Sequence, residues 1–350
     1  MPERHPEDTQ TLYSELLTLL LARESGRTWS HLAGTFTTKS VGGRDYLYFQ
    51  FSDPGGSKRQ FAVGPRTRSA HDIVRRYRQE RERVLEEDAA IGRLARMLRT
   101  AGIAVLPHPV ARVLRALADS GVFHLGGVLV GSYAFALIGN ALGVRWPGPA
   151  WRTHDLDVAG GLELVAPGLQ ADVPRALDSL AMGFVPVPQL DPRHPSTSFK
   201  VRGKTLRVDL LTPGREEDQA PVFLPRFQAA AAPIRYLSLL LAEAQPAAAV
   251  DGGATLVRVP DPARFALHKL LISQLRSMAQ HTKRTKDLHQ AALLLEVLAE
   301  ERPDDLARAA DSFRACGPGV ARKVLRALGS TARQHPAAAA GVEALRRTLK

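Results

Sequence analysis

The sequence predicts an α+β or α/β fold, with a mixed sheet and flanking helices at its centre. Three observations support this prediction. Strand signals alternate with helical periodicity over roughly the middle third of the 350 residues. Aromatic, β-rich runs separated by glycines precede this part, and leucine-rich amphipathic stretches follow it. We therefore expect an N-terminal unit with a β meander, a central core and a mostly helical C-terminal unit, at residues 1–108, 109–225 and 226–350.

The N-terminal unit begins with leucines at helical spacing from Leu12 to Ala22, which predict an amphipathic helix. The β-rich runs after it are broken by Gly42-Gly43 and by the Pro-Gly-Gly segment at 54–56, as hairpins are. The segment from Ser69 to Met97 has many arginines and glutamates and few apolar positions, which predicts a long, mostly exposed helix. The β-rich runs predict a three-stranded meander with strands near 35–37, 45–51 and 59–63.

The aromatic residues of the meander allow two interpretations. Tyr46, Tyr48 and Phe49, with Arg59 nearby, can stack on the bases of a nucleic acid and clamp its backbone. The same rings can instead form the core of the small sheet, which is the commoner use of such residues. The sequence leaves both interpretations open.

The central unit places a glycine–serine turn between a strand and a helix. The segment from Pro109 to Ser120 predicts a helix, and Val128 to Val130 predicts a strand that ends at Gly131-Ser132. The next helix runs through Ile138, so its first-turn amides face any anion that is bound at the turn. Ser132 is therefore a candidate phosphate ligand, and the alternative is a plain helix N-cap.

Three aspartates follow this turn on apolar strands. Asp155 and Asp157 lie two residues apart, which places both carboxylates on one face of a strand. Asp209 lies inside the apolar run 206–211, and residues 205–211 are predicted to pair with 198–201 as a hairpin. Three converging carboxylates repel one another unless cations neutralise them, and Mg²⁺ prefers such oxygen ligands. We therefore predict these three aspartates as catalytic residues that bind two magnesium ions, with Mn²⁺ as an alternative.

The segments around these motifs are less specific. The loop from Trp146 to Trp151 has tryptophans that either stack on a base or fasten the loop to the core. The segment from Val173 to Met182 predicts a helix. After Pro213 the alanine-rich and leucine-rich stretches show helical periodicity, interrupted by a short strand at 255–259, so we expect mostly helices there.

The C-terminal domain is predicted to be helical from Asp261 onwards. Asp261 can cap a helix that has Pro262 at its first position. Another helix is expected from Thr285 to Leu298. The tail after Asp304 contains two further amphipathic stretches, separated by a Gly-Pro-Gly segment.

Composition restricts the class of protein. A formal net charge of +12 favours polyanionic partners, although an arginine-rich, alanine-rich composition also fits a genome of high GC content. The single cysteine, Cys316, excludes an internal disulfide and a cysteine-built zinc site. No apolar run is long enough to span a bilayer, so we expect a cytoplasmic protein without a membrane partner.

The strand-turn-helix element and the three aspartates resemble the DNA polymerase β-type nucleotidyltransferase superfamily. Its signature is a Gly-Ser turn, a downstream Asp-x-Asp strand and a third Asp on a neighbouring strand. More narrowly, five runs resemble a bacterial family of nucleotidyltransferase-fold proteins, over about Val128 to Leu298. These runs are GSYAFALIGNALGVRW from Gly131, THDLDVA from Thr153, LRVDLLTP from Leu206, VPDPARFALHKL from Val259 and KRTKDLHQA from Lys283.

The resemblance implies a polymerase β-like core that transfers NMP from an NTP, such as ATP, to an acceptor hydroxyl. In related minimal nucleotidyltransferases, including toxins of toxin–antitoxin pairs, a helical lysine contacts the triphosphate and a later helical aspartate supports the site. Lys269 and Asp287 match those positions. Together with Gly131 and Ser132, they are the nucleotide-binding residues that the resemblance implies.

Bland alternatives exist for the two helical residues. Lys269 can extend from a packed helix to solvent without binding a ligand. Asp287 can form an ion pair within its own helix, with Lys283 or Arg284.

Two classes of function follow. As an enzyme, the protein transfers NMP to an RNA such as a tRNA end, to a protein side chain or to a small molecule, and a toxin or antiphage role would add a cognate antitoxin as partner. The alternative is a catalytically inactive protein that keeps the fold as a nucleic-acid-binding or regulatory module. The acidic triad favours the enzyme, because a scaffold gains nothing from three carboxylates that repel one another.

Overall fold

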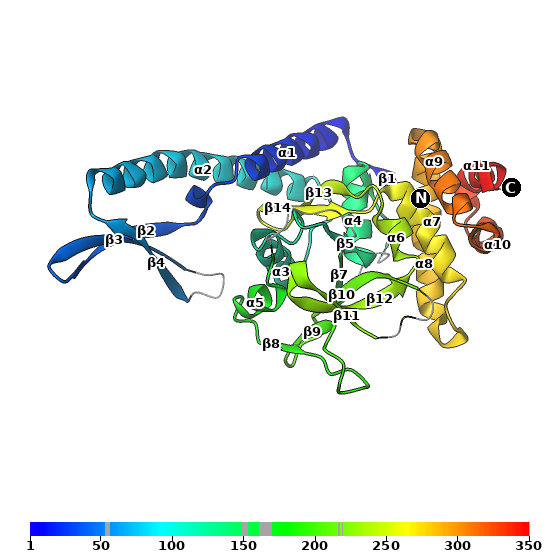
Figure 1. Cartoon of the computed structure of the whole chain (residues 1–350). Helices are drawn as coiled ribbons and strands as arrows, with labels where there is room; N and C mark the ends of the chain where they lie inside the picture. Colours follow the sequence, from blue (N-terminus) through cyan, green and yellow to red (C-terminus); the bar gives the residue numbers. More distant parts are fainter. Residues whose placement is uncertain (53–56, 149–152, 161–169, 216–217, 219, 350) are drawn as a thin grey trace.

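The computed structural model describes residues 1–52, 57–148, 153–160, 170–215, 218 and 220–349. Figure 1 shows a body that contains the central sheet and the C-terminal helices, and an arm that projects from this body. The predicted combination of a mixed sheet with flanking helices, an N-terminal meander with a long helix, and a helical C-terminal part is confirmed.

The arm consists of two long helices and a small sheet. Helix α1 (Glu7–Ser25) packs along helix α2 (Arg68–Thr100), and the sheet lies at the outer end of α2 (Figure 1). Thr67 caps α2 by accepting a hydrogen bond from the Ala70 amide. The three antiparallel strands of the sheet are, in order, β2 (Gly34–Val41), β3 (Arg44–Ser52) and β4 (Lys58–Pro65).

One face of the meander carries an aromatic core. Phe49 is fully buried, and its ring centroid lies 5.1 Å from that of Tyr77 on α2 and 5.3 Å from that of Trp29. Phe36 and Phe61 complete the cluster. Because edge-to-face ring contacts add to the burial of apolar surface, they fix the small sheet to α2. Phe49 therefore belongs to the core of the meander.

The root of the arm is anchored in the body by a second apolar cluster. The β13–β14 hairpin, with β13 at Gln245–Val250 and β14 at Ala254–Val259, closes this cluster from the body side. The Tyr13 hydroxyl accepts a hydrogen bond from the Ala248 amide (3.1 Å), which joins α1 to the hairpin. The buried members on the two helices are Tyr13, Leu16, Leu20, Ile91, Leu94, Ala95 and Leu98.

The sheet of the body is mixed. Its strands in the described ranges are β5 (Gly127–Val130), β7 (Asp155–Gly160), β8 (Phe184–Pro186), β9 (Ser198–Val201), β10 (Arg207–Gly214), β11 (Val222–Leu224) and β12 (Ala229–Arg235). They are ordered β11-β12-β10-β7-β5, with β9 against the first part of β10 and β8 against β9. Strand β10 runs parallel to β7 and β12, and β5 is antiparallel to β7. Strands β7 and β10 are therefore central.

Helices surround this sheet and form the C-terminal part. The earlier ones are α3 (His108–Asp119), α4 (Gly131–Ala141), α5 (Val173–Asp178) and α6 (Leu237–Leu241), and β1 (Glu3–Arg4) pairs with β6 (Val144–Arg145). The later ones are α7 (Pro262–Ser273), α8 (His281–Glu301), α9 (Pro303–Ala315), α10 (Pro318–Gln334) and α11 (Ala339–Leu349). Helix α7 begins at the predicted cap, where Asp261 accepts a hydrogen bond from the Arg264 amide (2.9 Å). One buried apolar cluster extends from α3 and the sheet to α11.

The prediction of helices in the alanine-rich segments after Pro213 is wrong. These segments form β12 and β13, on either side of the short helix α6. Alanine favours helices where nothing else decides, but Pro233 and Pro246 each lack the amide that a helix interior requires. Ala247 and Ala248 are fully buried, so close packing of neighbouring elements determines the strand conformation.

Two other predicted elements differ in extent. The helix predicted from Val173 to Met182 ends at Asp178, where the chain turns through Ala181 (φ 51°) and Gly183 (φ 78°). The tail after Asp304 contains three helices, α9 to α11, although the sequence predicts two amphipathic stretches. Among the described helices, none has the length and apolar character needed to cross a membrane.

Candidate active site

A glycine connects the end of a buried strand to the start of a helix. Strand β5 ends at Val130, and α4 begins at Gly131 with a φ of 72°, which residues with a side chain adopt at a cost. A Cβ atom at this position would also lie 2.3 Å from Oδ2 of Asp157. Gly131 therefore permits both the turn and the close approach of the Asp157 carboxylate to the start of the helix.

Strand register places the three predicted aspartates on one face of the sheet. Asp157 pairs with Val130 on β5 and with Asp209 on β10, and Asp155 lies two residues before it. Paired residues of neighbouring strands point to the same face, as do residues two apart on one strand. The three carboxylates therefore project from the same face of β7 and β10.

A cavity of about 500 Å³ opens on this face. Its acidic side comes from β7 and β10, and helices α7 and α8 contribute Lys269, Lys283 and Lys286. Apolar side chains such as Leu211 and Ile234 form another part of its lining. All seven residues that the sequence predicts for the site line this cavity, namely Gly131, Ser132, Asp155, Asp157, Asp209, Lys269 and Asp287.

Negative charge is destabilised on the acidic side of the cavity. The pKa of Asp157 is raised to about 6, first by burial and then by the charges of Asp209 and Asp155, against the opposing effect of Lys269 and Lys283. A raised carboxylate pKa means that the ionised form lacks sufficient compensation at its position. The acidic side is therefore an environment that favours a bound cation.

The Asp209 carboxylate is held by residues that sequence analysis did not identify. Its Oδ1 accepts hydrogen bonds from Nε of Arg207 (2.6 Å) and from the Ser198 hydroxyl, and Arg207 also donates to Ser198 (2.8 Å). Within the described ranges, no three His, Cys, Asp or Glu side chains are grouped closely enough to hold a metal ion. The chemistry of the donor set fits Mg²⁺, because it consists of carboxylates on one face, and binding an ion requires these side chains to move closer together.

The basic side of the cavity is organised by a buried aspartate. Asp287 is 3% exposed, and its two carboxylate oxygens accept hydrogen bonds from Nζ of Lys269 (2.8 Å) and Nε of Arg276 (3.1 Å). The same ammonium group lies 5.2 Å from the ring centroid of Phe265. Asp287 thus fixes two cations that line the cavity, and its ion pairs join α8 to the region of α7.

Ser132 lies in the first turn of α4, so the N-cap alternative is wrong. The N-cap position is Val130, whose side chain caps no amide. The next residue, Tyr133, donates a hydrogen bond from its hydroxyl to the carbonyl of Thr153 (2.9 Å). Tyr133 therefore ties α4 to the segment that leads directly into Asp155.

A histidine is buried next to Lys269. His268 is 5% exposed, and its Nε2 has no partner among the described residues. Burial lowers its pKa to about 3, with further lowering by Lys269 and Arg276 and an opposing effect of Asp287. His268 is therefore neutral at physiological pH.

Trp146 is part of the core. Its Nε1 donates to the Phe135 carbonyl (2.8 Å), and its ring stacks on Phe135 at a centroid distance of 4.6 Å. A Cβ at Gly139 would lie 2.3 Å from that nitrogen, so the helix must have a glycine there. Trp146 therefore fastens the loop to the core, as the second interpretation predicts. Trp151 lies outside the described residues.

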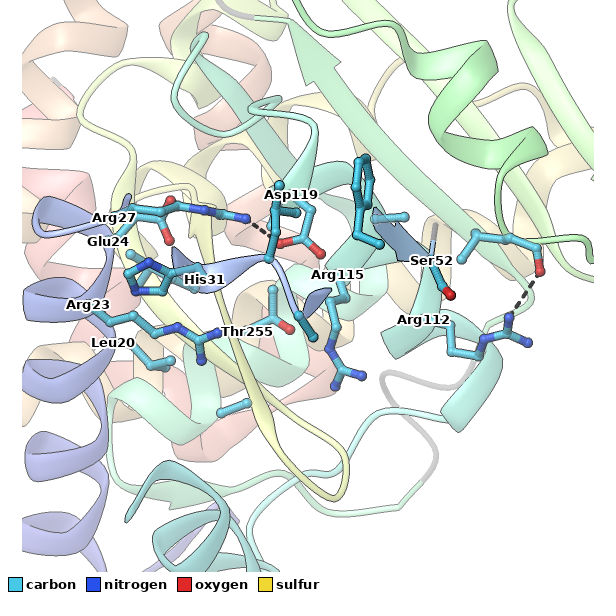
Figure 2. Close-up of a pocket in the computed structure, with 18 residues that line it drawn as sticks. Leu20, Arg23, Glu24, Arg27, His31, Ser52, Arg112, Arg115, Asp119 and Thr255 are labelled. Carbon is cyan, nitrogen blue, oxygen red and sulfur yellow. Dashed lines mark hydrogen bonds and ion pairs between the residues drawn. The ribbon is translucent and has the colours of Figure 1, made fainter. Parts of the chain in front are cut away.

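A second cavity, of about 510 Å³, lies at the joint between the arm and the body (Figure 2). Arginines from α1 and α3 line it, and Figure 2 shows Arg27 directed at Asp119 and Arg112 directed at a main-chain oxygen. Arg27 binds Asp119 at 2.6 Å and Glu24 at 3.1 Å. The Arg27–Asp119 pair therefore joins the arm to the body at this cavity.

Comparison with known proteins agrees with the geometry of the first cavity. A family model described as nucleotidyltransferase matches residues 108–315, which is more than half of the chain. The protein belongs to this nucleotidyltransferase family. The matched region contains β5, β7 and β10 as well as α7 and α8, so all seven predicted site residues of this nucleotidyltransferase lie within it.

The nucleotidyltransferase was also compared with solved structures and curated proteins. The crystal structure of an antigenic nucleotidyltransferase-like protein from Paracoccidioides brasiliensis is similar at 14% identity with a TM-score of 0.37. The alignment covers 69% of this chain and 95% of that chain. No curated protein matches the sequence.

The contacts of three further residues of the site depend on strand register and on helix packing, and the sequence did not predict these contacts. Arg207 and Ser198 face Asp209 because β9, β10 and their pairing align them. Arg207 stands two residues before Asp209, and this same-face spacing was the available signal. Arg276 had no such signal for its bond to Asp287, which depends on how α7 meets α8. The bland alternative for Asp287, a pair with Lys283 or Arg284, is wrong because its partners are Lys269 and Arg276.

Proposed function

We propose that this protein is a metal-dependent nucleotidyltransferase that moves NMP from an NTP to an acceptor hydroxyl. One observation carries the proposal: a single cavity combines three carboxylates, a helix start with a glycine, and two cations, Lys269 on α7 and Arg276 just after it, that Asp287 of α8 fixes. Family membership supports the class of reaction. The metal, the nucleotide and the acceptor named below are part of this proposal.

The chain offers a binding site for the triphosphate between α4 and α7. The first-turn amides of α4 have no partners within the helix and favour anions, and the Ser132 hydroxyl adds a donor. Lys269 contributes a positive charge whose direction is set by Asp287. The apolar side chains of Leu211, Ile234 and Ile272 provide a surface for the base.

The carboxylates provide the chemistry at the α-phosphate. Asp155, Asp157 and Asp209 would hold Mg²⁺ or Mn²⁺, which when bound neutralises the triphosphate and lowers the pKa of the acceptor hydroxyl. Asp209 accepts the hydroxyl proton, directly or through water. The acceptor oxygen bonds to the α-phosphorus, the bond to the β-phosphate oxygen breaks, and pyrophosphate leaves. Lys269 and the α4 amides stabilise the negative charge of the leaving group.

The test is transfer of label from NTP to an acceptor. The protein is incubated with each α-labelled NTP, Mg²⁺ and cell extract, beside the variant Asp155→Asn/Asp157→Asn. We expect labelled product with the wild-type protein and a loss on the order of a thousandfold in the variant, because an interaction of about 4 kcal/mol in the transition state is removed.

The matched control is Glu86→Gln/Glu87→Gln, which makes the same charge change on the exposed surface of α2. This control should keep full activity. Undiminished transfer by the aspartate variant would refute the assignment. Nucleotide binding without transfer by the wild-type protein would favour the inactive, regulatory alternative. Growth arrest on expression of the wild type alone would support a toxin role.

A further inference from the structure

The meander has two faces. The aromatic cluster with Trp29 and Tyr77 lies on the inner face, and the outer face carries a different set of side chains. Alternation along β3 puts Phe49 on the inner face, against Trp29 and Tyr77, and puts Tyr46 and Tyr48 on the outer face. Both tyrosines are half-buried among the side chains of their own sheet. The aromatic residues of the meander therefore divide into a core set and an outward set.

The outer face is basic. Lys39 pairs in register with Tyr46, Lys58 pairs with Ser52 next to the same row, and Arg44 lies two residues before Tyr46. All three cations are exposed. The remaining outward positions include Thr35, Thr37, Gln50, Gln60 and Ala62, and the exposed Val41, which pairs with Arg44.

The described strands of the meander carry no carboxylate on this face. Asp45 alternates to the opposite side, where it accepts a hydrogen bond from Ser40 and lies 3.7 Å from Arg66. Lys39 is held over the outer face, with its Nζ 5.1 Å from the ring centroid of Tyr48 and 2.8 Å from Oε1 of Gln60. The face thus combines two rings with cations that are not neutralised by acids of the same face.

From this combination we propose that the outer face of the meander binds single-stranded RNA. Tyr46 and Tyr48 lie two residues apart on one strand, about 7 Å, so successive unpaired bases can each stack on one ring. Lys39, Arg44 and Lys58 flank the rings and pair with the phosphates. Sheets that present aromatic residues in this way bind unpaired bases, whereas paired bases offer no free ring face.

The position of this face favours a polymer. The meander lies at the outer end of α2, away from β7 and β10, the strands that carry the three aspartates (Figure 1). A small acceptor bound there would be out of reach of the cavity, whereas an RNA strand can contact both. That the bound strand carries the acceptor hydroxyl rests on the proposed function, but the binding itself does not.

The experiment measures binding of fluorescein-labelled RNA to the full-length protein by anisotropy, without NTP. The ligand is a 20-nucleotide RNA of mixed sequence without secondary structure, titrated at several salt concentrations. Tyr46→Ala/Tyr48→Ala should bind about a hundredfold more weakly, because two stacked bases lose their platforms. Tyr46→Phe/Tyr48→Phe keeps both rings and should restore the affinity.

A charge variant supplies a second measurement. Lys39→Gln/Arg44→Gln/Lys58→Gln replaces exposed side chains, so the fold is retained. It should reduce the slope of log affinity against log salt by about 2, since each phosphate contact on a single strand contributes about 0.7. The matched control is Arg322→Gln/Arg326→Gln/Arg347→Gln, which removes the same charge from the surface of α10 and α11. This control should keep the wild-type slope.

Each outcome has one meaning for the proposal. Unchanged affinity of the tyrosine variant, equal losses in the charge variant and its control, or equal competition by duplex RNA would overturn it. An oligodeoxynucleotide of the same sequence separates RNA from DNA, and tighter binding of the DNA would overturn the assignment to RNA. Loss of transfer in Asp155→Asn/Asp157→Asn concerns the proposed function, whereas RNA binding by the tyrosine and charge variants concerns this proposal alone.

Discussion

Asp287 shows how a single buried carboxylate can position a cation at a ligand site. With both oxygens bonded to cations and almost no exposed surface, it is satisfied only while Lys269 and Arg276 stay in place. The lysine pays little further entropy on binding a phosphate, because its ammonium group is already held beside the cavity. Asp287 therefore contributes to the site by positioning Lys269 and Arg276, without contacting a ligand itself.

Lys269→Ala should bind NTP about tenfold more weakly or worse, since a charge-assisted hydrogen bond to phosphate is lost. Affinity is measured by isothermal titration with each NTP and Mg²⁺, and folding is checked by circular dichroism. Lys204→Ala, an exposed lysine outside the cavity, is the control and should bind as the wild type does. Equal affinity of Lys269→Ala and the wild type would exclude the lysine from the site.

At the scale of single residues, the predictable side chains are those whose spacing along a strand fixes the face to which they point. Asp155 and Asp157 share a face because they lie two apart, and Asp209 joins them because β10 pairs with β7 in register. The capture of Asp209 by Arg207 and Ser198 depends on side-chain geometry across two strand pairs, which spacing does not specify. The roles assigned to these residues stay predictions.

Among the elements, the junction of β5 with α4 sets the geometry of the site. It brings the start of a helix against the Asp157 carboxylate, and the close approach depends on the absence of a side chain at Gly131. Phosphate binding and metal binding therefore share one short segment of the chain. A change there affects both.

Gly131→Ala should abolish nucleotidyl transfer and lower the free energy of unfolding by about 1–2 kcal/mol, because alanine adds strain at positive φ. Gly203→Ala is a close control: Gly203 has a φ of 71°, yet a Cβ there meets nothing within 4 Å. Urea unfolding and label transfer are measured for both. A Gly203→Ala variant as inactive as Gly131→Ala would show that strain alone, and not the contact with Asp157, explains the loss.

Elements were predictable where local signals and packing agree. The hairpin that carries Asp209, the capped helix α7 and the meander each combine a turn or cap signal with the right periodicity. Strands β12 and β13 were missed because their alanines favour helices locally, while burial against neighbouring elements selects strands. Pro233 and Pro246 carried the contrary signal within these segments.

At the scale of the whole molecule, stability is coupled to pH through His268. The folded state holds this histidine neutral, with a pKa of about 3, whereas the unfolded chain binds its proton below about pH 6.5. Between these values the unfolded state binds more protons, so the free energy of unfolding falls as the pH falls. The folded protein is therefore most stable, as far as His268 is concerned, above pH 6.5.

Between pH 7.5 and 5.5 this one group should cost about 1.4 kcal/mol of stability. His268→Leu removes the titration and fills a similar volume without leaving a polar atom unpartnered. Urea unfolding at both pH values should show a difference that is smaller by that amount in the variant. An identical pH dependence in both proteins would mean that His268 titrates normally in the folded state.

The architecture as a whole followed from the order of sequence signals, but the relation of its parts did not. The β13–β14 hairpin comes late in the chain and still completes the apolar cluster beneath α1 and α2. Contacts between segments more than a hundred residues apart leave no periodic signal in either segment. The attachment of the arm is therefore a property of the folded chain.

That attachment has an apolar part and an ionic part. Helix α2 has 33 residues and is about 50 Å long, and only its last turns, from Ile91 to Leu98, are buried in the apolar cluster, so it holds the meander far from that anchor. The Arg27–Asp119 ion pair, which is exposed, also joins the arm to the body, and dissolved salt weakens such pairs. Dissolved salt therefore weakens only the ionic part of the attachment, whereas the buried apolar cluster keeps the root of the arm in place.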